Sequence, residues 1–556
     1  MRNRCGSTTA SQSPAAASIR EHGAHAAAQN VDGVKKSAPP RLRAALDLWQ
    51  QARWRECAVA LSELPEQEMR GEALLLKARL LVLRDPAAAV ALAGSMLHGR
   101  QSPHFRAEAL IVWGNALSRI GEYAEAEERL AQAERDGGDD PDLLAKVALY
   151  RSVSLMLQSR VDRIEPLLDT IKAARNPDIR AQGAAMYAVV LRHHEHYRAQ
   201  IPVLLQALLE LRAAEAPNLW VLCSILHMLA EIVVEFWEPT LATLVEEQFE
   251  RIAWHEEIAV WHFFISRALS CWYALAGDSF NAFRYLKRAI ELPVRDALKV
   301  LNHVDRAHLA HGLGESLWAQ QELTYADELC RHVAWETERD ERDDASIALA
   351  SLAELYARID PTKASEYLAR FQMFHQRLSS ANTRRHDRVD RAFVCGTKGM
   401  VGAALGKLGE AVRSLEESYE IYDEIGYDWR AGKVATELAS VSGNLHYLED
   451  ARKKLARYER SWLATSYREV AGRLGFANVL PGVRLTPAQW QVFHLLADGF
   501  SLGEVAAHLG RSLNTIRNHA GAIYAALGVH SQKELRALVR ARNRKESPSL
   551  NRTMSI

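Results

Sequence analysis

Cysteine is scarce in this chain and never closely paired. Six cysteines are spread over 556 residues, and none of them belongs to a C-x-x-C pair. This spacing offers neither a disulfide framework nor a zinc site, and it is typical of free thiols in a reducing compartment. We therefore expect an intracellular protein whose fold does not depend on disulfide bonds. The cysteines are Cys5, Cys57, Cys223, Cys271, Cys330 and Cys395.

Long apolar runs without charges are also missing. The most apolar run, residues 220–237, contains His227, Glu231 and Glu235 and therefore predicts a buried helix, not a membrane span. The N-terminus lacks the apolar core of a secretory signal. We expect a cytoplasmic protein with no membrane partner.

No phosphate-binding loop, catalytic pair or metal motif stands out. The Gly432-Lys433 pair lacks the flanking residues of the pattern G-x-x-x-x-G-K-[ST]. Among His193, His194 and His196, the side chains of His193 and His196 could share one helix face, but no third ligand accompanies these two. The group therefore suits a solvated hairpin end better than a metal site. We therefore expect a protein that is not an enzyme and that uses no cofactor and no metal.

The chain has no net charge, since 69 Lys and Arg residues balance 69 Asp and Glu residues. This balance excludes a protein that is basic throughout. The charge is segregated instead: residues 484–545 hold nine Lys and Arg against three Asp and Glu. A local basic excess predicts that this segment meets a polyanion.

Residues 484–545 are predicted to form four short helices. Thr486, Pro487 and Gln489 combine an N-cap residue, a proline at the first helical position and a T-x-x-Q capping box. Similar start signals recur downstream, and glycines close the second and third helices. The later starts are Ser501 with Glu504, Ser512, and Ser531 with Glu534, and the closing glycines are Gly510 and Gly528. Two short helices joined by a tight turn match the helix-turn-helix plan.

The third of these helices has an apolar face and a polar face. The apolar face is expected to pack on Leu496, Val505 and Leu509, and it consists of Ile516, Ala520, Ile523 and Leu527. The polar face carries Asn514, Arg517, Asn518 and Gly521. Asparagine can pair with an adenine edge, arginine with a guanine edge or a phosphate, and glycine permits close approach. The polar face therefore predicts base reading in the major groove.

These residues resemble the LuxR-type (GerE-like) DNA-binding domain. The matching positions include Leu485, Gly499, Glu504-Val505-Ala506, Thr515-Ile516-Arg517 and Leu527-Gly528-Val529. The resemblance implies a homodimer on double-stranded DNA. Candidate DNA contacts are Ser512, Asn514, Thr515, Arg517, Asn518 and Gly521, candidate phosphate contacts are Arg511, Lys533 and Arg536, and candidate dimer contacts are Leu535 and Leu538. Thr515 can equally support the start of the helix, and His519 is expected to be a packed helix residue.

The segment departs from this family at several charged positions. Ala488 and Gln489 stand where the family usually has Arg-Glu, and lysines are missing near Gly521 and at Ala526. Fewer cations should weaken the phosphate contacts that dominate affinity. A basic tail can compensate, and it consists of Arg536, Arg540, Arg542, Arg544 and Lys545.

Residues 41–471 show a recurring helical-hairpin pattern. The clearest copy has Gly114 on its first helix and Ala126, Leu130 and Ala133 on its second. This pattern of small and large residues resembles the tetratricopeptide repeat, which implies an α-solenoid whose first helices line one common surface. The repeat anchors are Ala126, Ile164, Gln200, Ala242, Ala282, Ala326, Ala364, Ala411 and Ala451, of which Ile164 and Gln200 belong to degenerate copies.

The expected fold is all-α: a tetratricopeptide-like α-solenoid followed by a C-terminal four-helix LuxR-type helix-turn-helix domain. Residues 1–40 and 546–556 are predicted to be disordered tails, and residues 472–483 a linker. The preferred function is a sequence-specific transcription regulator whose solenoid binds an effector or partner protein. The alternative is a non-enzymatic adaptor, in which the helix-turn-helix has become a protein-docking domain.

Overall fold

The computed structural model describes residues 38–158, 160–214, 216–333, 344–380, 388–474 and 485–538. Within these ranges the regular structure is helical and no residue belongs to a β-strand. The all-α fold class is therefore confirmed. Contacts divide the chain into two compact units: unit 1 holds Met1–Leu269, Glu291–Val294 and Leu378–Arg385, and unit 2 holds Ser270–Ile290, Arg295–Arg377 and His386–Ile556. Sequence analysis did not foresee this division of the repeat region.

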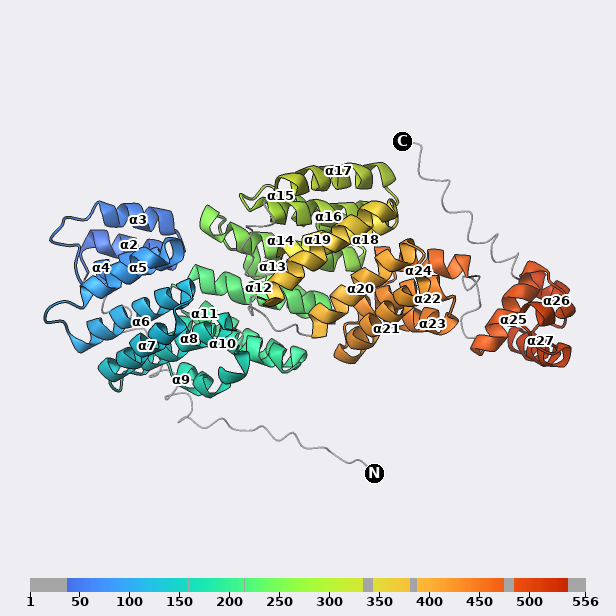
Figure 1. The fold of residues 1–556 in the computed structure, drawn as a ribbon, viewed down its shortest axis with the longest axis horizontal. Helices are drawn as coiled ribbons and strands as arrows, with labels where there is room; N and C mark the ends of the chain where they lie inside the picture. Colours follow the sequence, from blue (N-terminus) through green and yellow to red (C-terminus); the bar gives the residue numbers. More distant parts are fainter. Residues whose placement is uncertain are drawn as a thin grey trace, which may run out of the picture. The chain divides into compact units, whose positions relative to one another are not determined.

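Unit 1 is a series of helical hairpins (Figure 1). The six hairpins are α2 (Pro40–Gln50) with α3 (Trp54–Ser62), α4 (Glu72–Arg84) with α5 (Pro86–Met96), α6 (Pro103–Ile120) with α7 (Tyr123–Gly137), α8 (Pro141–Leu157) with α9 (Leu168–Lys172), α10 (Pro177–His193) with α11 (Gln200–Ala213), and α12 (Leu219–Phe236) with α13 (Pro239–Phe249). Short 3-10 turns interrupt the series at η1 (Val161–Arg163), η2 (Glu165–Leu167), η3 (Tyr197–Ala199) and η4 (Glu256–Ile258).

Unit 2 continues the same pattern and also contains the C-terminal helices. Helix α14 (Ala259–Ala276) crosses from unit 1 into unit 2. The following helices are α15 (Ser279–Ile290), α16 (Asp296–Gly312) with α17 (Ser316–His332), α18 (Asp344–Ala357) with α19 (Pro361–Ser380), α20 (Arg388–Ala404) with α21 (Leu408–Ile425), α22 (Asp428–Ser442) with α23 (Leu445–Leu455), and then η5 (Ala456–Tyr458) and α24 (Trp462–Arg473). The last three are α25 (Pro487–Asp498), α26 (Leu502–His508) and α27 (Leu513–Leu527).

Glycines on the first helices let the second helices pack closely. A Cβ atom at Gly114 would lie 2.8 Å from the Leu130 Cγ and 3.2 Å from the Ala126 carbonyl oxygen. Gly399 is in the same situation, since its Cβ would lie 2.5 Å from the Leu415 Cγ. These close approaches confirm that the small residues of the repeat pattern allow the two helices of these hairpins to pack closely.

The predicted repeat anchors are all buried in the structure. Each of the nine positions is exposed by 5% or less. The two degenerate anchors coincide with irregular structure, because Ile164 lies between η1 and η2 and Gln200 is the first residue of α11 after η3. The anchor residue therefore stays buried even in the hairpins whose second helix begins with a 3-10 turn.

The first hairpin of unit 1 contacts residues about 200 positions later in the same unit. The Arg55 backbone N–H donates to Glu257 Oε1 at 2.8 Å, and the His255 Nε2 lies 2.8 Å from the Gln51 carbonyl oxygen. The Trp54 and Trp220 rings are 4.8 Å apart between centroids. These contacts tie α2 and α3 to α12 and to the segment before α14.

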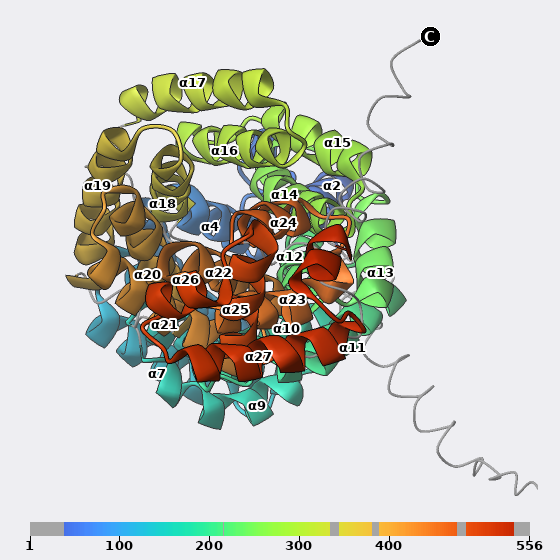
Figure 2. The same ribbon diagram turned by 90° about the vertical axis from the view of Figure 1, so that its right-hand side faces the viewer.

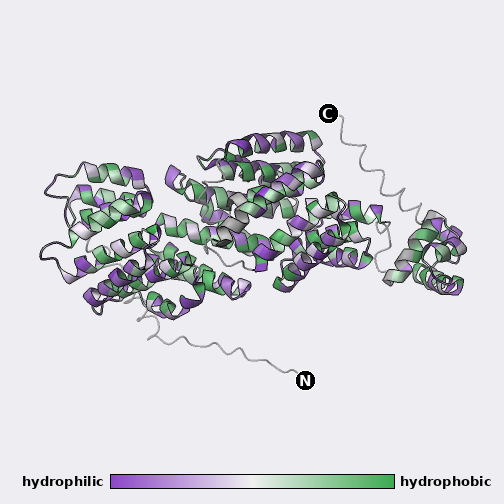
Figure 3. Cartoon of the chain, in the orientation of Figure 1, coloured by the Kyte–Doolittle hydropathy of each residue, from purple (hydrophilic) through white to green (hydrophobic). Residues whose placement is uncertain are grey.

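Two helices are long and apolar enough to cross a membrane, Leu219–Phe236 and Glu256–Ala276. More than half of each is buried inside the structure, 56% and 61% respectively. Figure 3 shows that hydrophobic and hydrophilic residues are interleaved along the helices of both units. The apolar run that sequence analysis singled out is thus part of the packed interior of its unit.

Candidate nucleic-acid interface

The C-terminal helices begin where the capping signals predicted. The Thr486 Oγ1 accepts from the Gln489 backbone N–H at 3.3 Å, and the Gln489 Oε1 accepts from the Thr486 backbone N–H at 2.7 Å. Ser501 and Glu504 form the same reciprocal box at 3.3 and 2.7 Å. The Ser512 Oγ accepts from the Thr515 backbone N–H at 3.1 Å. Each helix start therefore satisfies one or two of its own free N–H groups.

The fourth helix differs slightly from its predicted start. Residues 532–538 are helical, and the remainder lies outside the described residues. The Ser531 Oγ accepts from the Glu534 backbone N–H at 3.2 Å, but the Glu534 carboxylate accepts from the His530 backbone N–H at 2.8 Å, so the box is not reciprocal. Gln532, which sequence analysis did not single out, donates to the carbonyl oxygens of Leu496 and Phe500 at 2.9 and 2.8 Å. It fixes the fourth helix to the end of α25.

One apolar core holds the domain together. The buried residues of α27 pack against those of α25, α26 and the fourth helix. Figure 2 shows the ribbons of α25, α26 and α27. The core consists of Val492, Phe493, Leu496, Val505, Ala506, Ile516, Ala520, Ile523, Val529 and Leu535, with Leu509 and Leu527 partly buried against it. The predicted apolar face of α27 is therefore placed as expected, and it fixes which side of α27 faces outward.

The outward side of α27 carries the predicted reading residues. Asn514, Arg517, Asn518 and Gly521 are all exposed. The Arg517 Nη1 donates to the Asn514 Oδ1 at 3.3 Å, so the two side chains lie side by side on one face. No heavy atom outside the immediate chain would contact a Cβ at Gly521, which leaves the middle of this face flat. The face is free of the domain's own packing and open to a DNA groove.

The remaining candidate contacts fall into two groups. Ser512 is an exposed cap, while Thr515 is half-buried with its Oγ1 2.8 Å from the Ser512 Oγ, so Thr515 supports the helix start. Arg511 and Lys533 are exposed at the surface of the domain. Arg536 is half-buried, and its guanidinium covers Gly499, where a Cβ would lie 3.1 Å from the Arg536 Nη2.

Leu535 is a core residue in this structure. Its side chain is fully buried in the apolar cluster of the domain. Leu538 is half-buried and packs at the edge of the same core. The tail cations Arg540, Arg542, Arg544 and Lys545 lie outside the described residues.

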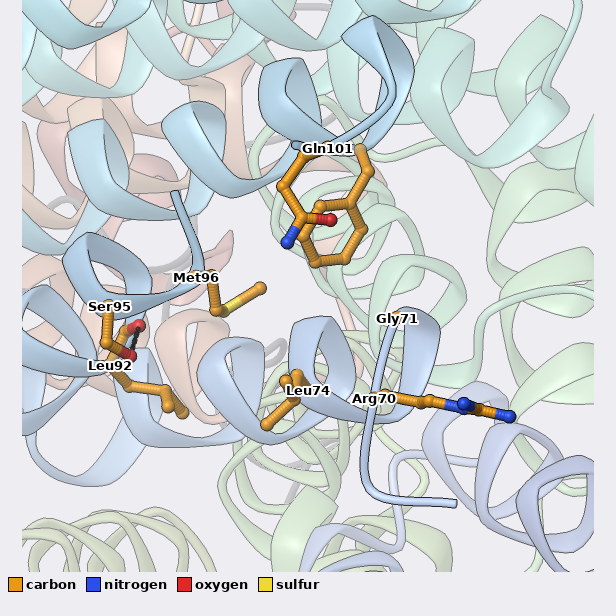
Figure 4. A pocket seen from close by; sticks show the side chains of 8 residues that line it. Arg70, Gly71, Leu74, Leu92, Ser95, Met96 and Gln101 are labelled. Carbon is orange, nitrogen blue, oxygen red and sulfur yellow. Dashed lines mark hydrogen bonds between the residues drawn. The ribbon is translucent and has the colours of Figure 1, made fainter. Parts of the chain in front are cut away.

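Unit 1 contains a hollow near its N-terminal helices. A hollow of about 600 Å³ opens between α4, α5 and the start of α6. Figure 4 shows the Leu74 and Met96 side chains on one side of it and Gln101 on the other. Apolar side chains dominate its wall, and Arg70 is the one charged residue among those that line it. Among the described residues no three His, Cys, Asp or Glu side chains are grouped as metal ligands.

Comparison with known proteins identifies the C-terminal domain. Residues 483–539 match the sequence profile of the family described as "GerE: Bacterial regulatory proteins, luxR family". These residues therefore form a LuxR-type helix-turn-helix domain, which supports a role in DNA binding and transcription regulation, and helical hairpins precede this domain in the described residues.

The rest of the chain has more distant likenesses. No relative was found among curated proteins. Among solved structures, the chain is similar to one titled "Crystal structure of APC/C hetero-tetramer Cut9-Hcn1", with 14% sequence identity, a TM-score of 0.40 and 94% of each chain covered.

Proposed function

We propose that this protein is a cytoplasmic, sequence-specific bacterial transcription regulator that associates with the nucleoid when bound to DNA. It binds a two-fold-related DNA site as a homodimer, with α27 in the major groove. The observation that carries this proposal is the separation of the two faces of α27. Ile516, Ala520 and Ile523 are committed to the core, while Asn514, Arg517 and Asn518 are exposed and unobstructed.

The repeat region is proposed to bind an effector or partner protein that controls the helix-turn-helix domain. Stacked helical hairpins present a continuous surface of first helices, and such surfaces bind peptides and proteins. The helical repeats occupy most of the described residues, from Pro40 to Arg473. A region of this size is larger than a spacer between two DNA-binding domains requires.

Selection of genomic DNA fragments with the full-length protein tests this function. The wild type is expected to enrich one pseudo-palindromic motif. Arg517→Ala and Asn518→Ala should each weaken binding to this motif by about 1–3 kcal/mol, because each removes contacts to base edges or phosphates while the core stays intact. His508→Ala is the matched control, because His508 is exposed on α26 and is not one of the α27 residues proposed to read bases. Equal affinity of all four proteins for the motif would refute the proposal.

The alternative function is an adaptor whose helix-turn-helix docks a protein. Few cations lie near α27: within residues 502–527, Arg511 and Arg517 are the Lys and Arg residues, and both are exposed. This small number of cations is the observation that favours the adaptor function. Salt separates the two functions, because phosphate contacts weaken steeply as ionic strength rises. An adaptor would select no DNA motif at any salt concentration.

A further inference from the structure

Helix α4 and the residue pair before it carry a regular stripe of cationic and apolar side chains. The α4 stripe consists of Arg70, Leu74, Lys77, Leu81 and Arg84, so that a cation recurs every seven residues and a leucine lies between successive cations. Arg70 lies just before the first residue of α4, and Arg84 is its last residue. Positions three and four residues apart lie on the same face of a helix. The stripe therefore runs along one face of α4.

The cations of the α4 stripe are exposed, whereas its two leucines are half-buried. Within the described residues, no ion pair or side-chain hydrogen bond involves any of the three cations. Two acids that flank the stripe in the sequence have other partners. The Glu72 carboxylate accepts from the Arg79 Nη1 at 2.7 Å, and the Asp85 Oδ1 accepts from the Ala88 backbone N–H at 3.0 Å. Three positive charges thus remain available on this face of unit 1.

Two hollows border the α4 stripe. The hollow of about 600 Å³ is lined by Arg70 and Leu74 together with residues of α5, the start of α6 and the segment between them. Figure 4 shows the Arg70 side chain at the edge of this hollow, where it extends away from Leu74. A second hollow of about 170 Å³ lies between α3 and α4, and Lys77, Leu81 and Arg84 line it. The other residues that line the second hollow are Ala58, Leu61, Ser62, Met69 and Leu80.

The charges around the two hollows have one sign. Among the described residues, the charged side chains that line them are Arg70, Lys77 and Arg84, with no Asp or Glu beside them. A basic partner would face like charges there, whereas an acidic partner is complementary. The apolar walls also distinguish this surface from one built for DNA, where most contacts go to phosphates. The chemistry that fits is a ligand with apolar groups and several carboxylates.

We propose that the α4 stripe and its two hollows form a docking surface for an acidic amphipathic helix of a partner protein. Apolar side chains of the partner helix enter the hollows beside Leu74 and Leu81, and its carboxylates pair with the three cations. Such a helix presents anchors at spacings of three and four residues, which is also the spacing of the stripe. This inference rests on the proposed function, in which the repeat region binds a partner, and it names the chemistry of that partner.

An anionic membrane is the competing occupant, because faces that combine cations with apolar residues also bind lipid surfaces. Membrane binding requires apolar side chains that enter the acyl region. Leu74 and Leu81 are half-buried instead, and the apolar surface beside them is recessed in the two hollows. A recessed apolar surface favours a partner that inserts side chains of its own.

The test uses full-length protein and three fluorescein-labelled synthetic peptides. The acidic peptide consists of three LEELAEE repeats, the second peptide has alanine in place of leucine (AEEAAEE), and the third has lysine in place of glutamate (LKKLAKK). Fluorescence anisotropy should show that the acidic peptide binds at least about 10-fold tighter than either of the others. The second peptide lacks the apolar anchors, and the third brings like charges together.

Reversal of two charges in the stripe tests where the acidic peptide binds. Lys77→Glu combined with Arg84→Glu should weaken its binding by at least about 10-fold, because carboxylates then face carboxylates. Arg135→Glu combined with Arg212→Glu is the matched control, since both are exposed helix residues of unit 1 outside the stripe, and it should bind as the wild type does. If circular dichroism shows a loss of helix in the first variant, Lys77→Gln combined with Arg84→Gln takes its place.

Equal affinity of the two double variants for the acidic peptide would overturn the proposal, and so would equal affinity of the wild type for the three peptides. Phosphatidylglycerol vesicles test the membrane. Vesicle binding that is lost in the Lys77 and Arg84 double variant, without binding of the acidic peptide, would overturn the proposal in favour of a lipid surface. None of these readouts involves DNA, so the docking surface can fail while DNA recognition stands. Selective peptide binding by a protein that selects no DNA motif would support the docking surface together with the adaptor function.

Discussion

Glu108 is a buried carboxylate in unit 1 that lies between cations from two neighbouring helices. Its Oε2 accepts from the Arg79 Nη2 at 3.0 Å, and its Oε1 pairs with Lys146. Burial by itself would raise the pKa of Glu108, but the Lys146 ammonium and the Arg79 guanidinium lower it to about 2. The ion group links α4, α6 and α8. Loss of the Glu108 carboxylate would leave the Lys146 ammonium without this partner, while Arg79 would keep its bond to Glu72 at 2.7 Å.

Glu108→Gln should lower the free energy of unfolding of unit 1 by about 3 kcal/mol at pH 7. The folded pKa lies below the unfolded value, so the stabilisation is complete above pH 4.5 and is lost as the pH falls toward 2. The difference from wild type should therefore shrink to about half at pH 3. Urea unfolding at pH 7 and at pH 3 measures the difference in stability between the variant and the wild type. Hydrogen exchange of α6 shows which unfolding transition belongs to unit 1.

Glu127→Gln is the control for this prediction. The Glu127 carboxylate pairs with Arg151 but is 57% exposed, so its loss should cost less than about 1 kcal/mol at either pH. If Glu108→Gln were as stable as Glu127→Gln at pH 7, the buried ion group would contribute nothing to the free energy of unfolding of unit 1, and the prediction would be wrong.

At the scale of a helical element, two glycines on α20 should respond in opposite ways to the same change. Gly399→Ala places a methyl group 2.5 Å from the Leu415 Cγ, so it should destabilise unit 2 by about 1–3 kcal/mol through overpacking. Gly402→Ala meets the Ala411 Cβ at 3.6 Å, an ordinary contact, and should stabilise the helix by about 0.5–1 kcal/mol. Thermal unfolding of both variants measures the difference. If Gly402→Ala were destabilised and Gly399→Ala were neutral, the close contact between Gly399 and Leu415 would not be what requires glycine in this hairpin.

Contacts between neighbours in sequence were predictable, and distant contacts were not. The offsets between Gly114, Ala126 and Leu130 and the capping boxes at Thr486 and Ser501 are local, so sequence patterns reveal them. The contact between Gly312 and Trp462 depends on the summed rotation of every hairpin between them. The same holds for the contact of Arg55 with Glu257 and for the division into two units.

At the scale of the whole molecule, charge is concentrated where DNA is expected to bind. The chain as a whole is neutral, whereas residues 484–545 hold six more cations than anions, from nine Lys and Arg against three Asp and Glu. Four of the nine cations, Arg540, Arg542, Arg544 and Lys545, follow the last described helical residue. Since the reading face itself carries one arginine, much of the phosphate attraction should come from this tail.

Replacing these four tail cations by alanine should therefore weaken DNA binding without changing which motif is selected. Each phosphate contact contributes about 0.9 to the slope of log K against log salt concentration, so four lost contacts per protomer reduce the slope by about 3–4 per protomer. Arg517→Ala should instead relax the choice of base at one position and reduce the slope by about 1 at most. Titrations of the selected motif at several salt concentrations measure both slopes. If the tail variant kept the wild-type slope, the tail would lie away from the phosphates, and the exposed Arg511 and Lys533 would have to supply the non-specific attraction in its place.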